Sequence, residues 1–242
     1  MLAPPEKKEQ IGDLSLFTYF TGESSGSALA LVSDHPNQSA AGLKRYLTPA
    51  ETAEGLKKTS PAAHRAWLLG RLAAKAAARR RWGFELSETE VVSAADGRPL
   101  LHAGGDGELF VSISHTSGAA AALAGDWPVG IDLEDAERDF SERMFKWAFS
   151  ETERALAPGA EDFGWPGPLA LWCAKEAAAK SWGRALLNHF DQVRAVGADW
   201  AGGLLEVAWL GPGPKRRCPV HLRRNQRFLL ALADDGRTAN SP

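Results

Sequence analysis

The alternation of hydrophobic and polar positions predicts short strands and one long helix in the first half of the chain. Leu14–Phe20 and Ser27–Ser33 have the alternating or apolar pattern of strands, with a Gly- and Ser-rich turn between them. A helix is predicted from about Pro61 to Trp82, where Ala, Leu and Arg dominate and Gly83 follows. The sequence Thr48-Pro49-Ala50-Glu51 predicts a capping box at the start of an earlier helix.

The rest of the chain contains the same kinds of element. Strands are predicted over five segments, namely residues 110–118, 119–124, 129–134, 203–210 and 220–233. The first of these runs into a polar bend at its Ser-His end. Helices are predicted over 141–149, from Ser150 onward, and around Trp172–Lys180, which stops at Gly183.

Two segments of the first half recur in the second half. Trp67–Lys75 aligns with Trp172–Lys180, and Val111–Asp126 aligns with Val220–Asp235, at similar offsets. A repeated pattern indicates a repeated structural unit. The chain is therefore predicted to have an α+β fold: a pseudo-twofold pair of similar α/β halves, each with a small antiparallel sheet packed on a long helix. The predicted parts are a loose tail over residues 1–12, an N-terminal half over 13–128 and a C-terminal half over 129–242.

The alignment of the two helices predicts a difference in charge between the halves. It places Lys75 on Lys180 and Arg71 on Glu176. The first half would offer cations to phosphates and the second would carry acids, so a phosphate-rich substrate is expected in a cleft between them. Solvated helix charges are the alternative interpretation of Arg71 and Lys75.

Composition and charge narrow the class of protein. The 242 residues are 44% hydrophobic and 24% charged, and the formal net charge of -2 gives no argument for a nucleic-acid partner. Two cysteines, Cys173 and Cys218, form neither a disulfide framework nor a metal cluster. No apolar run approaches the roughly 18 residues that cross a bilayer, and the polar first ten residues do not resemble a signal peptide. A cytoplasmic protein without a membrane partner is expected.

Three acids and two lysines form the candidate site. Asp132 and Glu134 lie two positions apart on a predicted strand, so their side chains share a face roughly 6.5 Å apart. Glu176 and Lys180 share a helix face, and Lys175 adjoins them. Because close carboxylates need a cation, and Mg²⁺ takes carboxylate and phosphate oxygens, we expect these three acids to bind Mg²⁺ and both lysines to face a phosphate. A solvent-exposed Glu-to-Lys pair is the alternative for the helix.

Four short motifs occur in order between about residues 45 and 185, namely Gly97-Arg98-Pro99, Ile113-Ser114-His115, Gly130-Ile131-Asp132-Leu133-Glu134 and Trp172-x-x-Lys175-Glu176-x-x-x-Lys180. Together they resemble the 4'-phosphopantetheinyl transferases of the larger, surfactin-synthetase-activating type. The resemblance implies a Mg²⁺-dependent enzyme that moves the phosphopantetheine arm of coenzyme A onto a serine of an apo acyl or peptidyl carrier protein. Adenosine 3',5'-bisphosphate would be released. The carrier could serve fatty-acid, polyketide or nonribosomal-peptide biosynthesis, and a monomer is expected because the fold is already doubled within one chain.

The resemblance implies metal-binding and catalytic roles. Asp132, Glu134 and Glu176 correspond to Mg²⁺ ligands of the family. Glu176 is the first candidate for the base that takes the serine proton, and a metal-bound water held by Asp132 or Glu134 is the second. Lys180 can neutralise or protonate the leaving bisphosphate.

Contacts to the phosphates of coenzyme A are also implied. Ser114 and His115 correspond to phosphate contacts, and Lys175 and Lys180 to lysines on the pyrophosphate side. A Ser-His bend after a strand can present both side chains and backbone N–H groups to a phosphate. A structural hydrogen bond is the alternative role for His115.

Two arginines correspond to contacts at the nucleotide end. Arg98 occupies the place of a basic residue that touches adenosine, and Arg71 falls where some members hold the 3'-phosphate. The chain departs from the family pattern just ahead of the long helix, where Glu51 and Glu54 replace a basic residue and Lys57–Lys58 is displaced.

Two other functions remain open from the sequence. One is a different Mg²⁺-dependent phosphoryl or nucleotidyl transferase, although the chain has no GxxxxGK[ST] phosphate loop. The other is a non-catalytic relative that binds carrier proteins, which would be expected to have lost at least one acidic ligand. The basic run from Lys215 to Arg227 could dock an acidic carrier helix or form a solvated edge.

Overall fold

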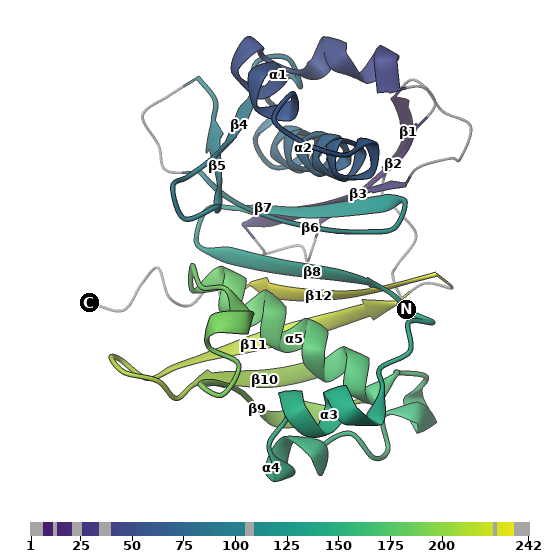
Figure 1. The fold of residues 1–242 in the computed structure, drawn as a ribbon, viewed down its shortest axis with the longest axis vertical. Helices are drawn as coiled ribbons and strands as arrows, with labels where there is room; N and C mark the ends of the chain where they lie inside the picture. The colour runs from purple at the N-terminus through teal and green to yellow at the C-terminus, as the bar shows by residue number, and fades with distance from the viewer. Residues whose placement is uncertain are drawn as a thin grey trace. The chain divides into compact units, whose positions relative to one another are not determined.

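The computed structural model describes residues 7–11, 14–20, 26–33, 40–104, 109–224 and 227–234, with the backbone alone at 7–11, 14–20 and 40–42. The chain forms two compact units, and the boundary between them falls after Pro128. Both units combine antiparallel strands with helices, as the sequence predicts (Figure 1). No helix among the described residues is long and apolar enough to cross a membrane.

The N-terminal unit has a five-stranded antiparallel sheet and one long helix. The strand order is β1 (Lys7–Ile11), β2 (Leu14–Phe20), β3 (Ser27–Ser33), β7 (Ala119–Gly125) and β6 (Phe110–Thr116). Helix α2 (Pro61–Trp82) packs on β3, β7 and β6 (Figure 1). The smaller elements are the 3-10 helix η1 (Ala40–Tyr46), helix α1 (Pro49–Gly55) and the hairpin of β4 (Glu90–Ser93) and β5 (Pro99–His102).

The predicted ends of the long helix are confirmed. The Ser60 hydroxyl accepts a hydrogen bond from the Ala63 N–H at 3.1 Å, and Pro61 occupies the first turn, where no N–H is needed. Gly83 ends the helix with a φ of 81°, a left-handed conformation that glycine adopts without strain. The alanines of the helix are buried against the alanines of β7, so helix and sheet approach closely.

The loose tail predicted over residues 1–12 is corrected for its described part. Lys7–Ile11 forms β1 and pairs antiparallel with β2 along its whole length. The sequence Lys-Lys-Glu-Gln-Ile has no strand-like alternation, which explains the error. A charged strand is well suited to the edge of a sheet, because charges discourage pairing with another chain.

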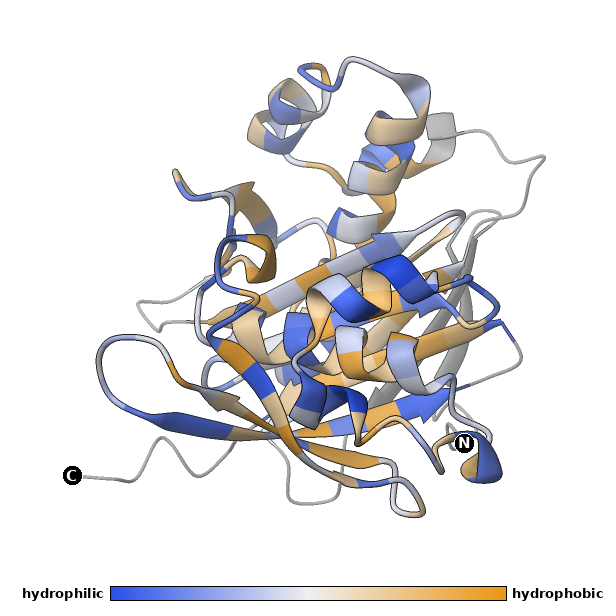
Figure 2. Ribbon diagram, turned by 60° about the horizontal axis from the view of Figure 1, so that its bottom comes forward, coloured by the Kyte–Doolittle hydropathy of each residue, from blue (hydrophilic) through white to orange (hydrophobic). Residues whose placement is uncertain are grey.

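The C-terminal unit has the same kinds of element. Its antiparallel sheet has the order β8 (Val129–Asp135), β12 (Phe228–Asp234), β11 (Arg216–Arg224), β10 (Leu204–Trp209) and β9 (Val193–Asp199). Strand β12 is hydrophobic from Phe228 to Ala233, whereas β11 begins and ends with arginines; Figure 2 colours the ribbon by hydropathy. The helical elements are α3 (Glu142–Ala148), α4 (Glu151–Arg154), η2 (Glu161–Phe163), α5 (Gly167–Ser181) and η3 (Leu186–Asn188).

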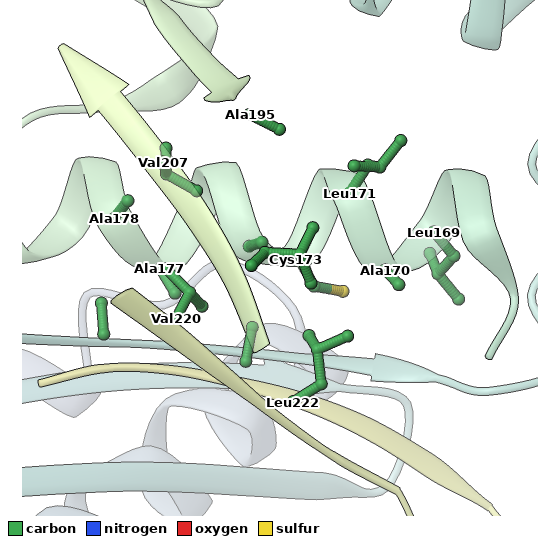
Figure 3. Packing of buried hydrophobic residues seen from close by; sticks show 14 of the residues in the cluster. Leu169, Ala170, Leu171, Cys173, Ala177, Ala178, Ala195, Val207, Val220 and Leu222 are labelled. Carbon is green, nitrogen blue, oxygen red and sulfur yellow. The ribbon is translucent and has the colours of Figure 1, made fainter. Parts of the chain in front are cut away.

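Helix α5 packs closely on its sheet. Figure 3 shows Cys173 and Ala177 of the helix with Val220 and Leu222 of β11, all of them buried. Strand β8 approaches the helix most closely at Gly130, where a Cβ atom would lie 1.9 Å from the Ala177 carbonyl oxygen. Only glycine fits there. This contact places the first half of β8 against the last turns of α5.

Candidate functional site

Two acids of β8 face helix α5. Asp132 pairs with Ala231 and Glu134 with Leu229, and both partners belong to the core that α5 covers. The Lys180 Nζ donates to the Asp132 Oδ1 at 2.8 Å and to the Ile131 carbonyl oxygen at 3.0 Å. The strand motif and the helix motif therefore meet in space, although they are far apart in sequence.

Both strand acids affect the pKa of Glu176. Burial raises the pKa of Glu176 to about 7, and the negative charges of Asp132 and Glu134 add to the rise, while Lys180 opposes it. Burial also raises the pKa of Glu134, to which Asp132 contributes, although Arg138 forms an ion pair with it. The three predicted acids thus form one electrostatic group with an excess of negative charge.

Lys180 is the cation of this group. Burial alone would lower its pKa, but the Asp132 carboxylate, through its charge and its hydrogen bond, and Glu176 together raise the pKa of Lys180. Lys180 is therefore charged at neutral pH. A group with three acids and one ammonium can bind a further cation and a phosphate.

The donor chemistry of the three acids fits Mg²⁺, which prefers carboxylate oxygens and substrate phosphates. Their geometry is not that of a closed ligand set: across the described ranges, no three His, Cys, Asp or Glu side chains are arranged to hold a metal. Lys180 Nζ donates a hydrogen bond to Asp132 Oδ1, and Arg138 Nη1 donates one to Glu134 Oε1, so these two carboxylate oxygens already have partners. Burial is the main cause of the raised pKa of Glu176, and the negative charges of Asp132 and Glu134, which a divalent ion would offset, add to it.

The N-terminal unit has a pocket of about 350 Å³. Its lining includes Lys58, Trp67 and Arg71 from the α1–α2 region, Pro99 at the start of β5, and His115 of β6. Arg71 and His115, two of the residues with predicted contacts to coenzyme A, therefore line the same cavity. Its basic groups and indole suit an anionic ligand with a planar ring.

Residues 128–233 match the family model of the 4'-phosphopantetheinyl transferase superfamily (ACPS). The matched region is the C-terminal unit. No curated protein matches the chain. For residues 128–233 the predicted resemblance is therefore supported at the level of the superfamily. All four residues of the electrostatic group, Asp132, Glu134, Glu176 and Lys180, lie within the matched region.

Lys175 is the clearest correction within the matched region. The resemblance implied that it contacts the pyrophosphate, but its side chain is 1% exposed and its Nζ lies 2.8 Å from the Glu153 Oε1. It also donates to the Ala148 carbonyl oxygen at 3.2 Å. Neighbouring helix residues point about 100° apart, so Lys175 enters the core while Glu176 faces the acids.

The same buried ion pair occurs in the N-terminal unit. Lys75 Nζ lies 2.8 Å from Glu51 Oε2, and neither side chain is exposed. Glu51 also completes the predicted capping box by accepting from the Thr48 N–H at 2.8 Å, and its other oxygen accepts from the Val91 N–H of β4 at 2.9 Å. Lys75 is therefore a structural residue, contrary to the expected role as a cation for phosphates.

Glu153 makes an equivalent set of contacts in the C-terminal unit. It caps α4 through the Ser150 N–H at 2.9 Å, and it accepts from the Ala195 N–H of β9 at 3.1 Å. Lys75 and Lys175 therefore have similar surroundings, whereas the sequence alignment predicts that Lys75 matches Lys180.

The side chains of Ser114 and His115 lie on opposite faces of β6. Both lie within β6, not in a bend, and successive strand residues point to opposite faces. His115 is exposed and lines the pocket together with Ile113, whereas Ser114 is 8% exposed on the other face. The structure therefore keeps His115 as a candidate contact and separates Ser114 from it.

Arg71 lines the pocket, whereas Arg98 does not. Arg71 lines it, but its Nη2 is held at 2.9 Å by Glu54 Oε1 and at 3.0 Å by Ser93 Oγ. Arg98 lies in an exposed turn, where its Nε is 2.7 Å from Asp96 Oδ2. Its neighbour Pro99 lines the pocket, whereas Arg98 itself does not. Ser93 could not be predicted from the sequence, because only the tertiary fold brings it to Arg71.

Proposed function

We propose that the protein transfers the 4'-phosphopantetheine arm of coenzyme A to a serine hydroxyl of an apo acyl or peptidyl carrier protein and releases adenosine 3',5'-bisphosphate. The main support is the meeting of Lys180 with Asp132, at 2.8 Å, beside a glutamate whose pKa is raised to about 7, all within the matched superfamily domain.

Asp132, Glu134 and Glu176 would hold Mg²⁺. When bound, the ion would neutralise charge on the pyrophosphate of coenzyme A. The acids' mutual repulsion supports this assignment, because it is the property that a divalent cation would remove. Turning Lys180 and Arg138 away from their carboxylates would open the oxygens that they now occupy.

The side chains of the site can move the required proton. The charge of a bound Mg²⁺ would keep Glu176 ionised, so that its carboxylate could act as the general base. It would take the proton of the serine hydroxyl as the serine oxygen forms its bond to the β-phosphorus. The bond from that phosphorus to the bridging oxygen breaks, and charged Lys180 would stabilise the departing bisphosphate.

We also infer that the two units are related halves, as in the surfactin-synthetase-activating type, and that the N-terminal pocket receives the nucleotide end of coenzyme A. Two observations support this. The Glu51–Lys75 and Glu153–Lys175 pairs have the same surroundings. In both units the strand before the helices, β3 or β8, pairs with the last strand of the unit, β7 or β12. A chain that already contains both halves would act as a monomer.

Intact mass spectrometry tests the function directly. Apo carrier proteins of fatty-acid, polyketide and peptide type are incubated with the protein, coenzyme A and Mg²⁺. We expect a mass gain of one phosphopantetheine on at least one carrier, and no gain with the Glu176→Gln variant, with EDTA, or on a carrier whose acceptor serine is replaced by alanine. Absence of the gain on every carrier, with the wild-type protein folded, would contradict the proposal.

A further inference from the structure

An acid lies directly on the arginine of the N-terminal pocket. Glu54 Oε1 accepts from Arg71 Nη2 at 2.9 Å, from Ser93 Oγ at 2.7 Å and from Trp67 Nε1 at 3.2 Å. The Arg71 side chain is 7% exposed and that of Glu54 is 19% exposed. The arginine is thus fixed in the pocket wall with its counter-charge attached.

Glu54 is ionised at neutral pH. Burial alone would raise its pKa, but the hydrogen bond from Ser93, the charge of Arg71 and the bonds from Arg71 and Trp67 lower the pKa of Glu54. Its negative charge therefore cancels the charge of Arg71 at short range. Lys58 also lines the pocket, and it forms no ion pair with any described residue.

On the basis of the proposed function, we propose that Glu54 sets the selectivity of this pocket between nucleotides with and without a 3'-phosphate. A pocket reads that phosphate through uncompensated positive charge. Since Glu54 neutralises Arg71, Arg71 adds little affinity for the 3'-phosphate, and Lys58 is left for the 5'-phosphate that both kinds of nucleotide carry. The protein should accept 3'-dephospho-coenzyme A nearly as well as coenzyme A.

Glu54→Gln isolates the charge. Glutamine has the same shape and keeps a carbonyl oxygen for Arg71, Ser93 and Trp67, but it leaves the arginine uncompensated. A unit charge acting on a phosphate a few ångströms away near a protein surface changes affinity by about tenfold or more. Glu88→Gln removes the same charge from an exposed residue outside the pocket lining and serves as the matched control.

Binding is measured by calorimetric titration with adenosine 3',5'-bisphosphate and with adenosine 5'-monophosphate, so that no transfer step is needed. For the wild type and for Glu88→Gln we expect affinities for the two nucleotides within about threefold of each other. For Glu54→Gln we expect the preference for the bisphosphate to rise about tenfold. Arg71→Gln should shift the preference the opposite way, because it leaves the Glu54 charge uncompensated, and thermal unfolding checks that each variant is folded.

Three results would overturn the inference: a wild type that already prefers the bisphosphate more than about tenfold, a preference unchanged in both pocket variants, or no binding of either nucleotide. Transfer from 3'-dephospho-coenzyme A and from coenzyme A to an apo carrier is then compared. A protein that binds both nucleotides with the expected ratio but transfers from neither donor would refute the enzymatic function and leave the selectivity of the pocket established.

Discussion

Lys175 and Lys180 belong to one sequence motif and one helix, yet their surroundings differ. Lys175 is buried with Glu153 in the core, and burial lowers its pKa. Lys180 is 27% exposed at its side chain and pairs with Asp132 at the candidate site. The helix therefore places one lysine in the core and the other at the candidate site.

Substitution of the two lysines should separate these roles. Lys175→Met leaves the Glu153 carboxylate buried without its ammonium, and breaking such a pair costs about 3 to 5 kcal/mol of unfolding free energy. Lys180→Gln affects a partly solvated pair and should cost on the order of 1 kcal/mol, while phosphopantetheine transfer is lost. Urea unfolding and the carrier assay measure the two effects. If the two variants lost the same amount of unfolding free energy, the two lysines could not be assigned different roles.

The pKa of Glu176 predicts how stability depends on pH without metal. Its pKa lies above the ordinary value of 4.5, at about 7, so the folded state binds more protons than the unfolded state between these values. The stability contributed by protonated Glu176 is complete below pH 4.5 and is lost as the pH rises through about 7, by at most roughly 3 kcal/mol. Urea unfolding in EDTA at pH 5 and pH 8 should show this loss in the wild type and a smaller loss in Glu176→Gln. Identical pH dependence in the two proteins would place Glu176 in a solvated setting.

At the scale of elements, the contact of β8 with α5 positions the site. A Cβ at Gly130 would lie 1.9 Å from the Ala177 carbonyl oxygen, a backbone atom that cannot turn aside. Gly130→Ala should therefore push the strand from the helix, lower the unfolding free energy by about 3 kcal/mol or more, and weaken transfer by displacing Asp132. Gly197→Ala in β9 is the control, because its Cβ would meet Glu206 only at 3.7 Å. Thermal unfolding and transfer rates of the two variants give the comparison.

Elements explain which parts of the site the sequence could predict. The i, i+2 spacing of Asp132 and Glu134 and the i, i+4 spacing of Glu176 and Lys180 fix a shared face within one strand or helix, so the acid group was predictable. The bend predicted at Ser114 and His115 was wrong, because the strand continues through both residues. Successive residues of a strand point to opposite faces of the sheet. The partners of Lys175 and Arg71, namely Glu153 and Glu54, lie on other helices. Their contacts depend on packing, which no local spacing encodes.

At the scale of the whole molecule, the proposed function assigns one part of coenzyme A to each unit, and ligand-linked stability can test the two assignments separately. A ligand present at about 100 times its dissociation constant stabilises the folded state by roughly 2.7 kcal/mol. Lys58→Ala, in the N-terminal pocket, should reduce the stabilisation by coenzyme A and leave that by Mg²⁺ alone unchanged. Glu134→Gln, in the C-terminal acid group, should reduce the stabilisation by Mg²⁺ and leave that by adenosine 3',5'-bisphosphate in EDTA unchanged. Thermal unfolding with each ligand measures these shifts. If each variant lost both the stabilisation by nucleotide and the stabilisation by Mg²⁺ equally, the nucleotide and the metal could not be assigned to separate groups of residues. The assignment of one ligand to each unit would then be wrong.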